Sequence, residues 1–337
     1  MMISLKDILN KRNSTRSLSD EEFEQCLPSL ARELESVDFR HAYEEDQLRK
    51  DWHSLISWKP EGTTINSTSR KGMKLCEHFC PNFFDISNPK GVSFTGLWKA
   101  ENLEKILRWN RRGHSTPYLS EIRRGIYFCC GLTKNTMYRP QMMKLACFRY
   151  KPTRVLDPCA GWGGRMLGAV SFGAHYIGFE PNTRTYENLR RMVDFLGIGG
   201  KVTLIHDDCR NMMKHDLPRV EMVLTSPPYF DLEVYCDEGT QSIKDHDSYE
   251  SWSDGFLREV IRLGIGMLMD GGVSCWNVGK VRNRDMQDDV RKHHLELGFH
   301  PIEVLKVSSS KRQSNQSSAR NEKNDDNTVT YKRTTNE

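Results

Sequence analysis

A rigid five-residue motif, Thr225-Ser226-Pro227-Pro228-Tyr229, stands near the middle of the chain. The apolar residues 220–224 before it are typical of a buried strand, and proline cannot donate to a sheet ladder, so the strand must end at the prolines. A plain strand exit is the simplest interpretation. The alternative is a stiff clamp for a flat, polar ligand, with an aromatic ring beside it.

A glycine-rich turn precedes this motif, in the sequence Asp157-Pro158-Cys159-Ala160-Gly161-Trp162-Gly163-Gly164. Between a strand and a helix, such glycines let the backbone approach a ligand at the helix N-terminus. The turn lacks the G-x-G-x-x-G spacing of dinucleotide sites. Asp157 ends the strand where a pyrophosphate would be repelled, so it suits a ligand with a cationic amine instead.

Carboxylates also follow the next two predicted strands: Glu180 ends the second, and Asp207 and Asp208 end the third. At this edge of a parallel sheet, Glu180 is placed to accept hydrogen bonds from ribose hydroxyls. A carboxylate after the third strand could accept from an adenine amino group. An amine, a ribose and an adenine together describe S-adenosylmethionine. The competing interpretation is a set of solvated acidic residues at strand tips.

The two motifs resemble those of the DNA amino-methyltransferases, which methylate the exocyclic nitrogen of cytosine or adenine. That family's cofactor turn, D-P-x-x-G-x-G, matches residues 157–163, and its catalytic motif, S/D/N-P-P-Y/F/W, matches residues 226–229. The resemblance covers about residues 136–307. It implies S-adenosylmethionine as cofactor, with eight binding residues: Tyr138, Arg139, Asp157, Ala160, Gly161, Gly163, Glu180 and Asp208.

The resemblance also implies catalytic roles for Ser226, Pro227, Pro228 and Tyr229. S-adenosylmethionine carries an activated methyl group, so the transfer needs little acid–base chemistry. Ser226 and the Pro227 carbonyl would hold the amino hydrogens, Tyr229 would stack on the base, and a base in a duplex must first be flipped out. Serine at the first motif position favours cytosine N4 over adenine N6. Cys159 lies on the cofactor turn, where its sulfur would not face a base, so we do not expect it to act as a nucleophile.

The elements that must position these residues alternate between strand and helix patterns from residue 150 onward. Strands are expected at 153–158, 175–181, 202–208, 220–228, 272–279, 300–307 and 328–333, and helices at 163–173, 183–197, 249–272 and 284–298. The alternation predicts an α/β domain with a mostly parallel sheet. With the resemblance, we expect a Rossmann-like, S-adenosylmethionine-dependent methyltransferase fold with seven strands.

Three segments are predicted: a peripheral helical segment over 1–45, a basic, aromatic-rich region over 46–135 and a methyltransferase domain over 136–337. Within the last segment, residues 308–326 are too polar to build a core and predict a mobile loop. Only 16 residues separate Asp208 from Thr225, too few for a target-recognition domain.

We therefore assign recognition of the nucleic-acid target to residues 46–135, to the loop 230–248, or to both. Residues 51–150 carry 16 Lys and Arg against seven Asp and Glu, a net charge of +9. Aromatic residues are interleaved with these cations, which is typical of a nucleic-acid surface. A solvated face around an ordinary core is the competing interpretation. The residues predicted to contact nucleic acid are Arg111, Arg112, Arg123 and Arg124.

Composition excludes several other classes. The 337 residues are 37% hydrophobic and 28% charged, as in a soluble globular protein, and no apolar run approaches the roughly 20 residues of a membrane span. Without a recognisable secretion signal, ten cysteines indicate reduced thiols in the cytoplasm, or in the nucleus of a eukaryotic or viral host. Cys76, His78 and Cys80 lack a second cysteine pair, so we expect no metal site. We expect His293 and His294 on the surface.

DNA is thus the predicted partner, with RNA as an alternative because single-stranded bases need no flipping. Two further hypotheses stay open. One is a catalytically silent nucleic-acid-binding protein, against which the intact motif set argues. The other is a phage-type hypermodification enzyme that transfers a different group to DNA.

Overall fold

The computed structural model describes residues 14–113, 116–281, 284–308 and 327–334. The contacts between residues divide the chain into two compact units. One is Met1–His41 with Phe83–Thr136, and the other is Ala42–Asn82 with Met137–Glu337. We call the first the helical unit and the second the sheet unit. The region predicted over 46–135 is divided between them. Residues 309–326 of the predicted loop lie outside the described residues.

The helical unit packs its helices around an aromatic core. Its elements are η1 (Ser14–Arg16), α2 (Asp20–Glu35), α5 (Phe94–Leu97), α6 (Ala100–Arg112) and α7 (Leu119–Cys129), with most of the 3-10 turn η2 (Pro81–Asp85). Phe39 lies at the centre, with ring centroids 5.4 Å from Phe84, 5.0 Å from Phe94 and 4.9 Å from Trp98. Apolar side chains of α2, α6 and α7 complete this core.

The sheet unit is built on eight strands in the order β1-β9-β10-β6-β5-β2-β3-β4. Their bounds are β1 (Thr64–Asn66), β2 (Arg154–Asp157), β3 (His175–Phe179), β4 (Val202–Ile205), β5 (Val220–Thr225), β6 (Leu268–Asn277), β9 (Phe299–Ser308) and β10 (Thr328–Arg333). Only β10 runs antiparallel to its neighbours within this sheet. The predicted α/β class with a mostly parallel sheet is therefore confirmed.

The predicted strand number was wrong, because β1 adds an eighth strand beside the seven that were expected. Its residues pair in parallel with β9, from Thr64 opposite Lys306 to Asn66 opposite Ser308. Ile65 is its one buried side chain. A three-residue strand between turns has too short a pattern to be recognised in the sequence.

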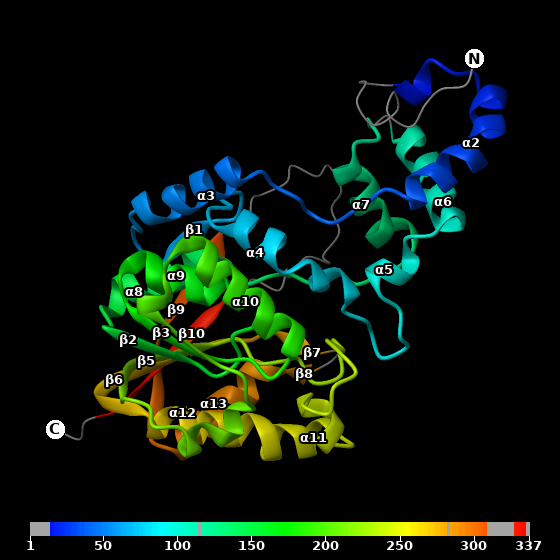
Figure 1. Cartoon of the computed structure of the whole chain (residues 1–337). Coiled ribbons are helices and arrows are strands. Elements are labelled where there is room, and N and C mark those ends of the chain that lie inside the picture. Colours follow the sequence, from blue (N-terminus) through cyan, green and yellow to red (C-terminus); the bar gives the residue numbers. More distant parts are fainter. Residues whose placement is uncertain (1–13, 114–115, 282–283, 309–326, 335–337) are drawn as a thin grey trace. The chain divides into compact units, whose positions relative to one another are not determined.

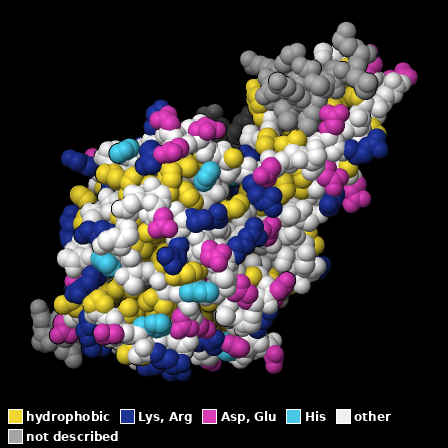
Figure 2. Space-filling model, in the orientation of Figure 1, with side chains coloured by type: hydrophobic (Ala, Val, Ile, Leu, Met, Phe, Trp, Pro, Cys, Tyr) yellow, Lys and Arg dark blue, Asp and Glu magenta, His cyan; other side chains and the backbone are white. Residues whose placement is uncertain are grey.

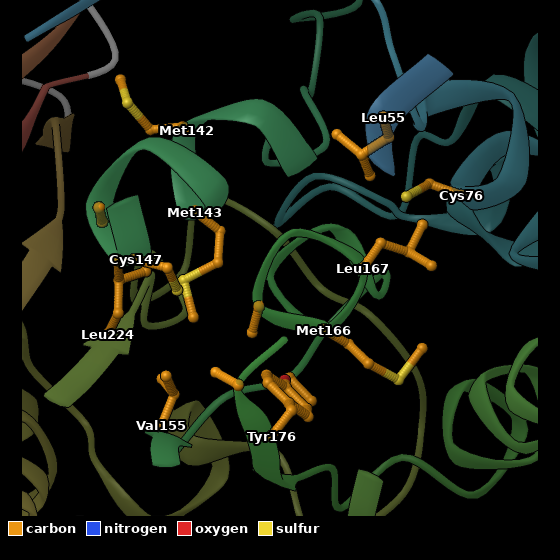
Figure 3. Packing of buried hydrophobic residues seen from close by; sticks show 14 of the residues in the cluster. Leu55, Cys76, Met142, Met143, Cys147, Val155, Met166, Leu167, Tyr176 and Leu224 are labelled. Carbon is orange, nitrogen blue, oxygen red and sulfur yellow. The ribbon is translucent and has the colours of Figure 1, made fainter. Parts of the chain in front are cut away.

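Helices cover both faces of the sheet, with α8, α9 and α10 on one side and α12 and α13 on the other (Figure 1). The bounds of the helices and short elements in this unit are α3 (Glu45–Ser57), α4 (Met73–Phe79), α8 (Pro140–Tyr150), α9 (Gly164–Phe172), α10 (Thr183–Leu196), η3 (Gly199–Lys201), η4 (Cys209–Lys214), η5 (Ser242–Asp245), α11 (Tyr249–Trp252), α12 (Arg258–Gly266), α13 (Met286–Glu296), β7 (Lys280–Val281) and β8 (Arg284–Asp285). Side chains from α8, α9 and the sheet pack together in the core between these helices and the sheet. There Met143 and Cys147 lie near Tyr176 and Val155 (Figure 3).

The single helix predicted over 249–272 is present to residue 266, but it contains a π-helical turn and ends earlier than predicted. A π-helical turn over Ser253–Leu257 connects α11 to α12, and β6 already begins at Leu268. Leu268 pairs with Val220 of β5, so the apolar residues 267–269 belong to a helix end and a strand start. A short apolar run fits either structure by pattern alone.

His293 and His294 are buried, so their predicted surface position was wrong. The His294 ring stacks on Tyr331 with centroids 4.0 Å apart, and its Nδ1 lies 2.7 Å from the Val290 carbonyl oxygen. Its Nε2 lies 2.9 Å from Ser274 Oγ. Burial lowers the pKa of His294 to about 3, so the ring is neutral in the folded protein.

Candidate active site

The glycine turn and the proline motif lie side by side because β2 and β5 are parallel neighbours. Val155 pairs with Met222 and Leu156 with Val223, so both strands end at the same edge of the sheet. The Thr225 hydroxyl donates a hydrogen bond of 2.8 Å to Asp157 Oδ1. Two motifs that are nearly 70 residues apart in sequence are thus connected directly.

The Asp157 carboxylate at the end of β2 is completely buried. Besides the bond from Thr225, its Oδ2 accepts hydrogen bonds from Arg165 Nε and from the Tyr176 hydroxyl, each 2.7 Å long. Because these three side chains occupy it, the carboxylate is not exposed to the cationic amine that the sequence predicted as its partner. Asp157 instead joins β2 to β3, β5 and α9.

Arg165, in the first turn of α9, is a site residue that sequence reasoning missed. Its guanidinium is buried, pairs with Asp157, donates to the Cys159 carbonyl oxygen and lies 5.1 Å from the centroid of the Tyr138 ring. An unpaired charge inside a protein is strongly unfavourable, so each partner needs the other. The sequence offered one signal for this role. Arg165 is the only charged residue in a helix whose other residues are mostly apolar.

Glu180 follows β3 and connects it to the glycine turn. Its Oε2 accepts a hydrogen bond of 2.9 Å from the Gly161 amide, and its Oε1 accepts one of 3.0 Å from the Asn182 amide. Burial raises the pKa of Glu180 to about 7, although both amides favour the charged form. A buried carboxylate with remaining acceptor capacity at this place fits the hydroxyls of a ribose.

The turn itself requires its glycines. Gly161 has φ +57° and Gly163 has φ +79°, backbone conformations that L side chains rarely adopt. A Cβ at Gly164 would clash with the Tyr138 carbonyl oxygen, so the segment before α8 packs directly on the start of α9. Arg139 in that segment donates a hydrogen bond of 2.7 Å to the Ser69 carbonyl oxygen.

The carboxylates after β4 are both engaged. Asp208 caps η4 and accepts two hydrogen bonds from the Arg210 guanidinium, at 2.7 and 3.0 Å, and Arg210 also pairs with Asp245 at 2.7 Å. Asp207 accepts from Asn211 and lies 2.9 Å from His215 Nε2. Asp208 and Glu180 therefore lie at the same edge of the sheet, after the parallel strands β4 and β3. An adenine amino group that binds Asp208 would have to share this carboxylate with Arg210.

The proline motif leads into a strained residue. Phe230 has φ +46°, and a bulky side chain in this left-handed region marks local strain. Its ring packs against Tyr249 and Trp252, with centroids 5.8 and 5.9 Å away. Strain of this kind persists only where the surroundings impose it, and it clusters at functional sites. The strained residue Phe230 directly follows Tyr229 of the proline motif.

The loop 230–248 reaches the glycine turn and adds residues that sequence reasoning did not single out. The Tyr235 ring lies 6.2 Å from the Trp162 ring, and its hydroxyl donates to the Glu233 carboxylate. Burial raises the pKa of both Glu233 and Tyr235. Glu238 accepts two hydrogen bonds of 3.2 Å at the N-terminus of α10, which ties the loop to a second element.

The basic excess of residues 51–150 is partly offset within the folded chain. In the view of Figure 2, Lys and Arg side chains are interspersed with Asp and Glu and do not gather in one patch. Three ion pairs join cations of this stretch to acids of the first 50 residues: Glu24 with Arg108, Asp20 with Arg111, and Glu35 with Lys99. The net charge of residues 51–150 leaves out these acids of the first 50 residues, which the fold brings next to the cations.

The four arginines predicted to bind nucleic acid differ in their surroundings. Arg111 donates to the Leu18 carbonyl oxygen at 2.9 Å and to Asp20, and Arg123 donates to the Phe39 carbonyl oxygen at 2.8 Å. These two hold the helical unit together. Arg112 and Arg124 are exposed.

Cys76 in α4 and Cys80 directly after it have structural surroundings. Cys76 and Cys80 are fully buried in the sheet unit's core, and His78 Nδ1 accepts a hydrogen bond of 3.2 Å from the Tyr43 amide. Among the described residues, no group of three or more His, Cys, Asp or Glu side chains is arranged to hold a metal ion. Within the same part of the chain, no helix combines the length and apolar character needed to cross a membrane.

Residues 220–337, about a third of the chain, match the model of the N6_N4_Mtase family, described as DNA methylase. The match includes the proline motif and stops short of the glycine turn. No match was found among curated proteins.

Several solved structures resemble the chain at low identity. TrmN from Thermus thermophilus is 14% identical, with a TM-score of 0.41, and the alignment covers 58% of this chain and 49% of TrmN. This chain thus matches about half of TrmN's length. An S-adenosylmethionine-dependent O-methyltransferase from Thermotoga maritima is 12% identical, with a TM-score of 0.40 and coverage of 62% and 70%. Precorrin-6y C5,15-methyltransferase from Geobacter metallireducens is 15% identical, with a TM-score of 0.42 and coverage of 60% and 93%.

Proposed function

We propose that this chain is an S-adenosylmethionine-dependent methyltransferase that acts on the exocyclic amino group of a DNA base, with cytosine N4 favoured over adenine N6. One observation carries the proposal: the glycine turn and the Ser-Pro-Pro-Tyr motif end adjacent strands and are joined by the Thr225–Asp157 hydrogen bond. The DNA methylase match over residues 220–337 supports the same class of reaction.

The cofactor fits the residues at the ends of β2 and β3. Glu180 would accept from its ribose hydroxyls, and the backbone of Gly161 and Gly163 leaves room for a ligand because no side chain projects there. Asp157 and Arg165 act as positioning residues, because both form hydrogen bonds with the backbone of Cys159 in the turn. S-adenosylmethionine, when bound, supplies the activated methyl group.

The base would meet the proline motif. The oxygen of Ser226 and the Pro227 carbonyl are acceptors for amino hydrogens, and the two prolines hold both in place. Hydrogen bonds to those hydrogens favour a more tetrahedral nitrogen with its lone pair available for transfer. Tyr229 would stack on the base, which must leave the duplex to reach this edge.

Mass spectrometry of nucleosides tests the proposal. Duplex DNA and RNA of matched sequence are incubated with the protein and S-adenosylmethionine, then digested. We expect N4-methylcytosine in DNA. N6-methyladenine would overturn only the base preference, which depends on Ser226, whereas methylated RNA alone would replace the substrate. A methyl group on cytosine carbon 5 would contradict the mechanism, and no modified nucleoside in either polymer would contradict the activity.

A further inference from the structure

An aromatic pair on the surface of the helical unit stands apart from that unit's core. Trp109 of α6 and Phe128 of α7 have ring centroids 5.7 Å apart and planes that differ by only 12°. Phe128 is 65% exposed, the highest value for a large hydrophobic side chain among the described residues. Core aromatics such as Phe94 and Trp98 are less than 5% exposed, so burial does not explain this pair.

A cation lies over both rings. The Arg124 guanidinium carbon is 5.6 Å from the Trp109 centroid and 5.5 Å from the Phe128 centroid, which is the range of cation–π attraction. Arg124 remains 49% exposed and is also paired with Glu121 at 3.3 Å. The three side chains thus form one preassembled group of two flat rings and a planar cation.

Two further cations share the face of α6 that carries Trp109. Lys105, Trp109 and Arg112 are spaced four and three residues apart, which places them on one side of a helix. Lys105 and Arg112 are both exposed. Positive charge therefore flanks the rings, and it complements the phosphates of a nucleic-acid backbone.

The helix pair beneath this group is tightly packed. A Cβ at Gly125 of α7 would clash with the Ile106 side chain of α6, which is itself fully buried. The glycine lets the two helices approach closely, so the rings are carried on a fixed support. A rigid aromatic surface loses little conformational entropy when it binds a ligand.

We infer that Trp109, Phe128 and Arg124 form a stacking site for an unpaired base of single-stranded DNA, with Lys105 and Arg112 contacting its phosphates. The inference rests on the proposed action on DNA. Base–aromatic stacking is sequence-tolerant because every base has a flat face, and arginine adds a cation–π contribution. Flipping a target base leaves its partner unpaired, so such an enzyme handles exposed bases.

A protein partner fits this surface less well. Protein interfaces combine aromatic residues with a desolvated apolar centre that is depleted in charge. Among the described residues of the helical unit, Tyr118 and Phe128 are the only large hydrophobic side chains counted as exposed. Two rings amid three cations lack the aliphatic surroundings of such a centre.

Fluorescence anisotropy of a labelled 20-nucleotide single strand of DNA, titrated with the full-length protein, tests the inference. Phe128→Ala should weaken binding by about 5- to 150-fold, the effect of losing one stacked base. Phe128→Trp should retain the affinity. Phe148→Ala is the matched control, because Phe148 is an exposed ring on α8 of the sheet unit with the Lys151 ammonium 3.6 Å from its centroid. It should bind like the wild type.

Salt dependence separates stacking from charge. Phe128→Ala should leave the slope of log affinity against log salt unchanged, whereas Arg112→Gln should reduce it by about 0.7, the value for one phosphate contact on a single strand. Phe128 is exposed, so its replacement should not alter the melting temperature. If Phe128→Ala binds the strand as tightly as the wild type, or if Phe148→Ala weakens binding equally, the inference is wrong.

The nucleoside assay distinguishes that failure from failure of the proposed function. Methylated DNA with unchanged affinity in Phe128→Ala would refute only the stacking site. A wild-type protein that neither binds the single strand nor methylates DNA would refute both.

Discussion

Glu180 provides the sharpest test of the cofactor site, because its charge should change within an accessible pH range. Burial raises its pKa to about 7, and hydrogen bonds to the Gly161 and Asn182 amides hold both carboxylate oxygens in place. Ribose hydroxyls donate to the ionised form. Below about pH 7 the carboxyl group is protonated in the free protein, so binding must first remove that proton. Cofactor affinity should therefore fall as the pH decreases.

The magnitude follows from proton linkage. One pKa unit corresponds to about 1.4 kcal/mol, so affinity should drop about tenfold for each pH unit below 7 and level off above it. Isothermal titration calorimetry with S-adenosylmethionine between pH 5.5 and 7.5 measures this directly. Glu180→Gln should weaken binding at pH 7.5 by about 1–3 kcal/mol, through lost and mismatched hydrogen bonds. It should also remove the pH dependence.

Glu303→Gln serves as the control. Glu303 lies on β9 and accepts hydrogen bonds from Arg149 and Tyr150, which lower the pKa of its carboxyl group against the effect of burial. Three strands separate β9 from β2 in the sheet, so cofactor affinity should not change. An affinity that stays constant from pH 5.5 to 7.5 in the wild type, or one that survives Glu180→Gln, would refute the assignment of Glu180.

Three other predictions concern the motif, the turn and stability. Tyr229→Ala should remove stacking worth about 1–3 kcal/mol, slow methyl transfer and leave calorimetric cofactor binding nearly unchanged; equal turnover would exclude a stacking role. Cys159→Ser should retain most activity, because direct transfer needs no thiolate, whereas a trapped covalent adduct with DNA would contradict this. His294, with a pKa of about 3 when folded and about 6.5 when unfolded, should contribute stability above pH 6.5 that is lost as the pH falls toward 3. Urea denaturation at pH 7.5 and 5.5 should show a smaller difference for His294→Asn than for the wild type.

The strand–helix alternation was readable from the sequence because β2 and β3 are short apolar runs that are followed by the periodic helices α9 and α10. The ends of β2, β3 and β5 could be located for the same reason, since glycine, acidic and proline residues stop the apolar runs. β1 could not be found, because three residues carry no period. The position of His294 was missed as well, although it lies four residues after the buried Val290 and thus on the same helix face.

Charge was the least reliable property to read along the chain. The +9 excess of residues 51–150 suggested one basic surface, yet Arg108 and Arg111 pair with Glu24 and Asp20 from the N-terminal helix. A sequence window cannot register contacts between segments that are more than 80 residues apart. Among the cations that stay exposed, Lys105 and Arg112 of α6 and Arg124 of α7 lie beside two aromatic rings.

Asp157 shows how a motif residue can have structural contacts that its sequence pattern does not reveal. Its position at a strand end before a glycine turn is the feature that suggested contact with a charged ligand. In the structure it accepts hydrogen bonds from the side chains of Arg165, Tyr176 and Thr225 and from the Cys159 amide, and the Arg165 guanidinium balances its charge inside the protein. The carboxylate fixes the backbone of the turn and the exit of β5 relative to each other. Methyl transfer needs its two reactants closely aligned, because a misplacement of about 1 Å can cost about 100-fold in rate. A buried group that joins both motifs can meet that requirement without touching either reactant.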